Sequence, residues 1–176
     1  PYWNASFGNS ESSHAFGREA ANALERARQT VATVLDCHLS EIVFSGSGTE
    51  SDNLAIRGAA WAARQAGRGH HIVSTPIEHH AVGHTLDQLR DLFGFDVEQV
   101  PVDRYGLVDP DAVAAALRSD TVLVSVITAS NEIGTVQPIA EIGKVCRSRG
   151  VLFHTDAVQA PGRLPLEPDA LEVDLL

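Results

Sequence analysis

The chain is poor in the residues that mark several classes of protein. It has 13 lysines and arginines against 23 aspartates and glutamates, which gives a formal net charge of −10 at pH 7. A nucleic acid or an anionic membrane surface is therefore not an expected partner, because both attract basic surfaces. No apolar run approaches the roughly 20 residues of a membrane-spanning helix, so no membrane segment is predicted.

Cysteine, lysine and methionine are also scarce. Cys37 and Cys146 lie far apart and form no CxxC motif, a usage typical of a reducing, cytoplasmic setting. Neither cysteine neighbours a motif, so we interpret both as buried or partly buried thiols. Lys144 is the only lysine, and methionine is absent even at position 1. Because the final residues also stop inside an apolar run that resembles a strand, we expect a piece of a longer protein.

The residues that are present indicate one α/β domain. The chain is 44% hydrophobic and 20% charged, with a mean hydropathy of −0.04, as in globular proteins. After a predicted loop over residues 1–16, helices and strands alternate. The predicted helices cover residues 17–35, 50–66, 78–93, 110–118 and 139–149. The predicted strands cover residues 42–44, 71–75, 95–101, 121–128, 151–154 and 171–176.

This alternation predicts a three-layer α/β/α sandwich with a mainly parallel sheet. Residues 121–128 are nearly all apolar, as in a strand covered on both faces. The first helix shows one apolar face, made of Ala20, Ala23, Leu24, Ala27, Val31 and Val34. Polar residues follow four of the predicted strands, at 46–49, 78–80, 130–132 and 156–159. Because ligands bind beyond the carboxyl ends of parallel strands, these residues are expected to form one site.

The glycine-rich stretch 44–53 (FSGSGTESDN) predicts an anion site. It joins a predicted strand to a helix, and a helix amino terminus offers free N–H groups and a positive dipole to a phosphate. Gly46 and Gly48 allow a close backbone approach, and Thr49 adds a hydroxyl or caps the helix. A dinucleotide site is disfavoured because the next strand ends at Thr75 without the acid that such sites require. An ordinary helix cap is the other open interpretation.

Three histidines follow the second of these strands. His80 and His84 have the i, i+4 spacing of some metal ligands, but no third ligand is evident, so no metal is predicted. A single imidazole, that of His79, can instead lie flat on an aromatic ligand. A surface or capping histidine is the alternative.

Asp156, Gln159 and Asn131 suggest recognition of a heterocycle. Asp156 follows a strand directly and has apolar neighbours, so its carboxylate needs a cationic or N–H partner. The protonated ring nitrogen of pyridoxal 5′-phosphate (PLP) is such a partner. The amides of Gln159 and Asn131 can reach the same ligand. Helix capping by Asp156 and turn formation by Asn131 are the alternatives.

Together these motifs resemble those of the PLP-dependent cysteine desulfurases, of the nitrogen-fixation and iron–sulfur-cluster type within the class V aminotransferases. The motifs are 44–53, 78–82 (EHHAV), 130–135 (SNEIGT), 154–159 (HTDAVQ) and, less closely, 8–14 (GNSESSH). The resemblance covers essentially the whole chain and implies the large domain of the type I PLP-dependent transferase fold.

The resemblance also implies a role for each residue. Gly48 and Thr49 would hold the PLP phosphate, and His79 would stack on the ring and take part in proton transfer. Asp156 would pair with the ring nitrogen. Asn131 and Gln159 would bind near the phenolic oxygen.

The resemblance further implies an activity: removal of sulfur from L-cysteine, giving L-alanine and an enzyme persulfide for iron–sulfur cluster or thio-cofactor assembly. A homodimer, with residues 1–16 near the partner subunit, and a sulfur-acceptor protein are expected. The family's Schiff-base lysine, nucleophilic cysteine and substrate-binding arginine lie in later segments, and Lys144, Cys37 and Cys146 match none of them. Residues 1–176 are therefore expected to be an incomplete cofactor-binding domain, inactive alone. A further departure is Ser10, where the family usually has proline.

Three other functions stay open. A selenocysteine lyase or another class V enzyme shares much of the pattern. A nucleotide-binding α/β module without PLP would use the glycine loop alone. A PLP-free remnant of the fold would use none of these residues.

Overall fold

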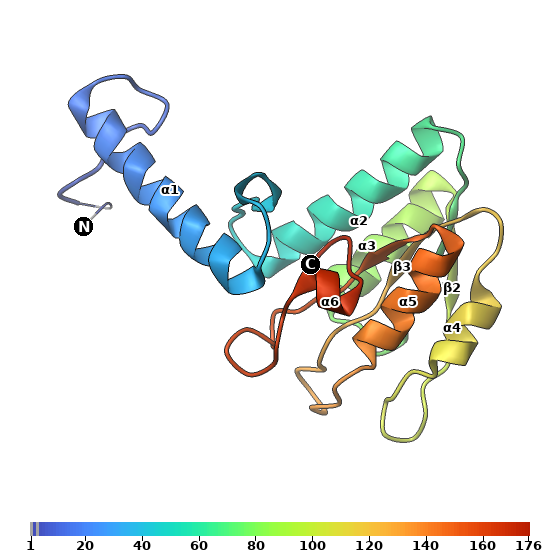
Figure 1. Cartoon of the computed structure of the whole chain (residues 1–176). Helices are drawn as coiled ribbons and strands as arrows, with labels where there is room; N and C mark the ends of the chain where they lie inside the picture. Colours follow the sequence, from blue (N-terminus) through green and yellow to red (C-terminus); the bar gives the residue numbers. More distant parts are fainter. Residues whose placement is uncertain (1, 3) are drawn as a thin grey trace. The chain divides into compact units, whose positions relative to one another are not determined.

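The computed structural model describes residue 2 and residues 4–176 and divides the chain into two compact units, Pro1–Phe44 and Ser45–Leu176 (Figure 1). The loop predicted over residues 1–16 includes residues 1 and 3, which lie outside the described residues. Its described part leads into the first helix without regular secondary structure.

The first unit contains the helix α1 (Ala15–Leu35) and the short 3-10 helix η1 (Leu39–Glu41). The ring of His14 caps α1, since its Nδ1 accepts the N–H of Gly17 at 3.1 Å. The predicted helix is confirmed, but burial of its apolar face is not, because Leu24 and Val34 stay exposed. The described part of this unit has no second layer of structure to cover that face.

The strand predicted over residues 42–44 is wrong. Ile42 has extended backbone angles, but this segment joins no ladder with any described strand. Extended residues become a strand only when a neighbouring strand takes up their N–H and C=O groups. Here the guanidinium of Arg28 donates to the carbonyl of Ile42 and lies 5.0 Å from the ring centroid of Phe44.

The second unit is built on a four-stranded sheet of order β2-β1-β3-β4 in which all pairs are parallel. The strands are β1 (His71–Ser74), β2 (Asp96–Gln99), β3 (Thr121–Ser125) and β4 (Leu152–His154). The predicted parallel sheet is thereby confirmed, with strands shorter than expected.

The strand predicted over residues 171–176 is wrong in its larger part. Pro168–Leu171 form the short helix α6, and only Leu175 makes an isolated parallel bridge, to His154. Proline suits the first position of a helix, so Pro168 starts α6, which extends to Leu171 at the beginning of the predicted strand.

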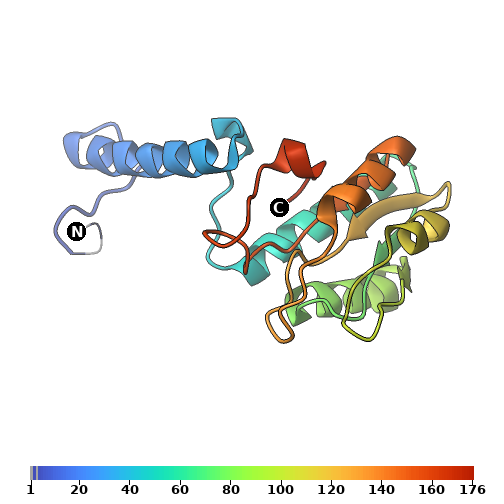
Figure 2. The ribbon, with the colours of Figure 1, turned by 60° about the horizontal axis from the view of Figure 1, so that its bottom comes forward.

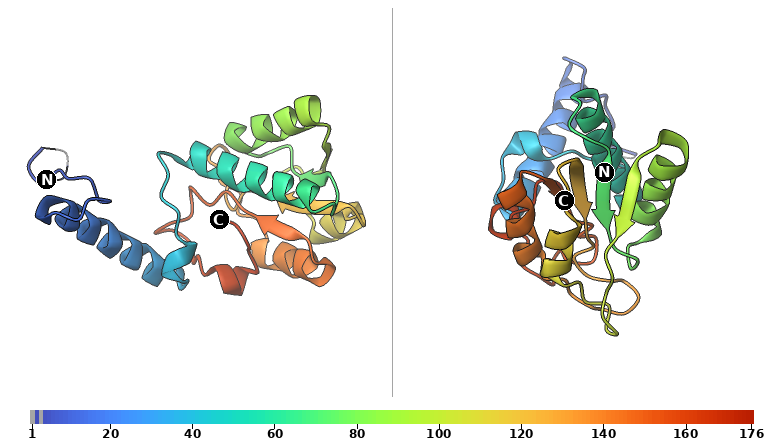
Figure 3. Two further views of the ribbon diagram at one scale, coloured as in Figure 1. Left: turned by 90° about the horizontal axis from the view of Figure 1, so that it is seen from above. Right: turned by 90° about the vertical axis from the view of Figure 1, so that its right-hand side faces the viewer.

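Helices cover both faces of the sheet, as predicted (Figures 2 and 3). Their bounds are α2 (Gly48–Gln65), α3 (His80–Phe93), α4 (Pro110–Ala116) and α5 (Ile139–Arg149). Successive strand side chains point to opposite faces. Ile72 therefore packs in the core beneath α2 and α3, and Val73 in the core beneath α4 and α5.

Local signals explain where these helices start and stop. α3 and α5 end at Gly94 and Gly150, whose φ angles of 65° and 66° are left-handed. α4 begins after the predicted cap Asp109, which accepts the N–H of Asp111 at 2.9 Å. Within the described range, none of the helices has both the length and the apolar character to cross a membrane.

Candidate active site

One cleft of about 200 Å³ opens at the carboxyl ends of β1, β3 and β4. Its lining residues come from the start of α2, the cap of α3 and the loops after β3 and β4. They are Gly48, Thr49, Asp52, His79, Ile127, Asn131, Asp156, Val158 and Gln159. All six residues proposed from the sequence, namely Gly48, Thr49, His79, Asn131, Asp156 and Gln159, lie in this set. Their roles toward a ligand stay predictions.

The glycine loop forms the amino terminus of α2. Ser47 caps the helix by accepting the N–H of Glu50 at 3.2 Å, and Glu50 in turn accepts the N–H of Gly46 at 2.7 Å. The N–H groups of the first helical turn have no intrahelical acceptor and can serve an anion. A Cβ on Gly48 would lie 2.7 Å from Cγ2 of Val158, so glycine is required for this close approach.

His79 caps α3 rather than lying inside it. Its Nδ1 accepts the N–H of Ala81 at 3.1 Å, which leaves Nε2 as the protonated nitrogen of the neutral ring. The rings of His80 and His84 stack on each other with centroids 5.1 Å apart. No group of three or more histidine, cysteine, aspartate or glutamate residues that could hold a metal occurs among residue 2 and residues 4–176.

Asp156 lies two residues after the end of β4 and is 5% exposed. Its Oδ1 accepts the N–H of Val158 at 3.0 Å. The side-chain oxygen of Gln159, three residues after Asp156, accepts a hydrogen bond from Arg163 Nη1 at 3.2 Å. The carboxylate is thus fixed by its own loop and buried at the edge of the sheet.

Asn131 lies in a loop closed by an antiparallel bridge between Ala129 and Val136. The hydroxyl of Ser130 accepts the N–H of Glu132 at 3.3 Å, which orders the turn that carries Asn131. Asn131 is exposed and lines the cleft.

Asp52 also lines the cleft, although the sequence did not predict it there. Asp52 is 5% exposed and lies on the buried face of α2 together with Ile56 and Ala60. One sequence feature could have predicted this position. Asp52 is a carboxylate on an otherwise apolar helix face, one turn after the glycine loop. Burial, with a further contribution from the charge of Asp156, raises the pKa of Asp52 to about 7.

Glu78 was expected near the site as one of residues 78–80, without a predicted role, and it lies next to the cleft lining rather than in it. Its Oε1 accepts the hydroxyl of Thr75 at 2.6 Å and the N–H of Ile127 at 3.0 Å, so it joins the ends of β1 and β3. The residue is half-buried, but its Oε2 is shielded from solvent and has no hydrogen-bond partner. Burial raises the pKa of Glu78 to about 8.

His154 lies beneath these acids. Its Nδ1 is 2.9 Å from Oγ of Ser125, and its Nε2 is 3.6 Å from Oδ1 of Asp52. Burial lowers the pKa of His154 to about 4, so the ring is neutral near pH 7. None of the described residues that line the cleft is a lysine or an arginine. The cleft therefore combines an anion-binding helix terminus with acids that suit a cationic group.

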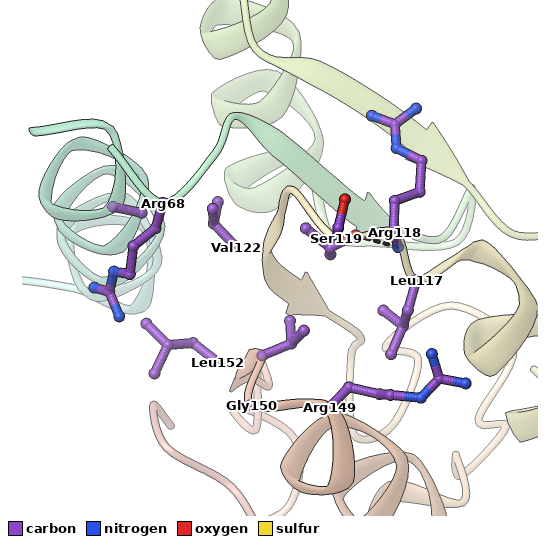
Figure 4. A pocket seen from close by; sticks show the side chains of 11 residues that line it. Arg68, Leu117, Arg118, Ser119, Val122, Arg149, Gly150 and Leu152 are labelled. Atoms are coloured by element: carbon purple, nitrogen blue, oxygen red, sulfur yellow. Dashed lines mark hydrogen bonds between the residues drawn. The ribbon is translucent and has the colours of Figure 1, made fainter. Parts of the chain in front are cut away.

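A larger cleft, of about 550 Å³, lies at the opposite edge of the sheet, where β3 and β4 begin (Figure 4). Arg68, Arg118 and Arg149 line it, but Figure 4 shows their side chains pointing in different directions. Arg118 is paired with Asp96 and with Asp120. These arginines therefore do not converge on a common anion.

The aminotransferase class-V family model matches residues 1–176. The cysteine desulfurase IscS of Dictyoglomus turgidum is 46% identical over the whole chain, which spans 44% of that relative's length. Two solved structures, a NifS-like protein and SspA in complex with cysteine, each superpose with a TM-score of 0.92. Their identities are 38% and 36%, over 98% and 99% of this chain and 47% and 49% of theirs. The chain belongs to the aminotransferase class-V family.

Proposed function

We propose that this cleft binds PLP and that the chain is the cofactor-binding part of a cysteine desulfurase. One observation carries the proposal: a helix amino terminus and a buried carboxylate, Asp156, line the same small cleft. PLP pairs an anionic phosphate with a ring nitrogen that a carboxylate keeps protonated. Class V aminotransferases are PLP-dependent enzymes, which supports the choice of ligand.

The residues present fit this ligand. Gly48 and Thr49 would hold the phosphate with first-turn N–H groups and the threonine hydroxyl. Asp156 would accept a hydrogen bond from the protonated ring nitrogen, because a cationic N–H partner stabilises a buried carboxylate. Asn131 and Gln159 would donate amide N–H groups to the phenolic oxygen, and the exposed ring of His79 would cover one face of the heterocycle.

When bound, PLP supplies an electron sink for chemistry at the α-carbon of an amino acid. The chain's own residues then set the conditions for that chemistry. Asp156 favours the charged ring nitrogen. His79 can hold or move a proton at Nε2, because the N–H of Ala81 occupies its Nδ1. Lys144 lies exposed on α5 and does not line the cleft, so no cofactor role is assigned to it.

The substrate proposal rests on the relatives. Since the chain spans 44% of the length of the IscS relative, the activity of the whole protein is inferred from that family. L-cysteine is the proposed substrate, and L-alanine and an enzyme persulfide are the proposed products. The SspA structure, solved with cysteine, supports the substrate class. A homodimer and a sulfur-acceptor protein stay predictions.

Binding of pyridoxamine 5′-phosphate tests the cofactor proposal. This compound keeps the phosphate and the ring nitrogen but needs no lysine, so it can bind the 176-residue chain non-covalently. Its fluorescence titration should saturate at one ligand per chain. Asp156→Asn should weaken binding about tenfold to a hundredfold, since a hydrogen bond to a charged group contributes about 1.5–3 kcal/mol.

Glu141→Gln, at an exposed residue in the first turn of α5, provides the matched control and should bind like the original chain. Adenosine diphosphate provides the competing ligand. The proposal fails if pyridoxamine 5′-phosphate does not bind, if Asp156→Asn binds equally well, or if the nucleotide binds in its place.

A further inference from the structure

Two buried carboxyl groups from different elements line the proposed cofactor cleft. Asp52 comes from α2 and Asp156 from the loop after β4, and each is 5% exposed. The described lining residues offer no lysine or arginine to compensate them. Two like charges that share a desolvated site cannot both ionise without a large cost, so one group keeps its proton.

The hydrogen bonds indicate which group keeps it. Asp156 Oδ1 accepts the N–H of Val158 at 3.0 Å. A hydrogen bond donated to a carboxylate stabilises its ionised form. Oδ1 of Asp52 has His154 Nε2 at 3.6 Å, which is longer than a hydrogen bond. Because burial lowers the pKa of His154 to about 4, this ring gives Asp52 no positive charge near pH 7.

The other ionisable groups around Asp52 agree with this assignment. Glu78, before α3, is neutral near pH 7, since burial raises its pKa to about 8. His79, at the cap of α3, is exposed and lines the same cleft. Asp156 is therefore the group whose negative charge acts on Asp52, and together with burial it raises the pKa of Asp52 to about 7.

We propose that Asp52 is a positioning residue that keeps a proton while the cleft is free and releases it when a cationic ring nitrogen binds against Asp156. This inference rests on the proposed function. The O–H bond of Asp52 breaks, its electron pair stays on the carboxylate, and the proton passes to the buffer. The bound cation then compensates both carboxylates. Asp52 acts through Asp156 and sets how much negative charge the ligand meets at a given pH.

Proton counting by calorimetry tests the inference. Pyridoxamine 5′-phosphate is titrated into the chain at pH 7 in two buffers with different heats of ionisation. A group with a pKa near 7 is half protonated at this pH, so the original chain should release about half a proton more than Asp52→Asn. Glu141→Gln should match the original chain. Equal proton release by the original chain and Asp52→Asn overturns the inference.

Carboxyl ¹³C NMR titration of Asp52 needs no variant that might misfold. In the free chain the midpoint should lie near pH 7, and saturating pyridoxamine 5′-phosphate should lower it by at least about one pH unit. A midpoint near pH 4 in the free chain, or no change on binding, overturns the inference. Failure of the ligand to bind overturns the proposed function instead, and the free-chain midpoint still decides the protonation of Asp52.

Discussion

Replacing Glu78 with glutamine should remove a large pH-dependent loss of stability. Glu78 Oε1 already accepts hydrogen bonds from Thr75 and from the N–H of Ile127, and an amide oxygen in the same place can accept both. Its Oε2 is inaccessible to solvent and unpartnered, so the cost of burying the charged form exceeds what the two hydrogen bonds to Oε1 return. Glutamine keeps the shape of the side chain and cannot ionise.

The magnitude follows from the pKa of Glu78, which burial raises from 4.5 to about 8. Between these values the unfolded chain has lost the proton and the folded chain keeps it. The free energy of unfolding therefore falls as the pH rises, by ~1.4 kcal/mol per pH unit. This loss is absent below about pH 4.5 and complete above about pH 8, where it amounts to about 5 kcal/mol.

Urea denaturation of the original chain and Glu78→Gln at pH 5, 6, 7 and 8 measures this effect. From pH 5 to pH 7 the stability of the original chain should fall relative to the variant by about 3 kcal/mol. Glu141→Gln, an exposed replacement of the same kind, should keep a constant difference from the original chain. Parallel pH profiles for the original chain and Glu78→Gln would refute the buried, protonated state of Glu78.

Two further predictions test the cleft and the core. Gly48→Ala should weaken the binding of pyridoxamine 5′-phosphate, measured by fluorescence, because its Cβ would lie 2.7 Å from Val158 Cγ2. Val158→Ala should restore binding in the double variant, and unchanged binding by Gly48→Ala alone would contradict the steric reason. Leu89→Ala, at a fully buried position, should cost about 3–5 kcal/mol of unfolding free energy. Leu92→Ala, where the side chain is 70% exposed, should cost less than about 0.5 kcal/mol, and equal losses in urea denaturation would show that this core is misplaced.

Much of the fold could be predicted from local sequence. The helix over residues 139–149 was predicted with its observed bounds, because its apolar spacing is followed by Gly150 in a left-handed conformation. The parallel sheet followed from the alternation of helices with apolar strands. The segments at 42–44 and 171–176 were predicted wrongly because their composition suits strands. Pairing partners decide whether such segments become strands, and the described residues provide none at 42–44 and one isolated bridge at 175.

The sequence by itself identified six of the nine residues that line the candidate site. His79, Asn131, Asp156 and Gln159 come together because parallel strands deliver their following loops to one edge of the sheet, whereas Gly48 and Thr49 reach this edge at the start of α2. Only the tertiary structure decided the electrostatics of that site. Burial depends on what packs against a side chain, so the raised pKa values of Asp52 and Glu78 could not be inferred from the residue types. The neutral state of His154 beneath them has the same physical cause, since burial removes its ring from water.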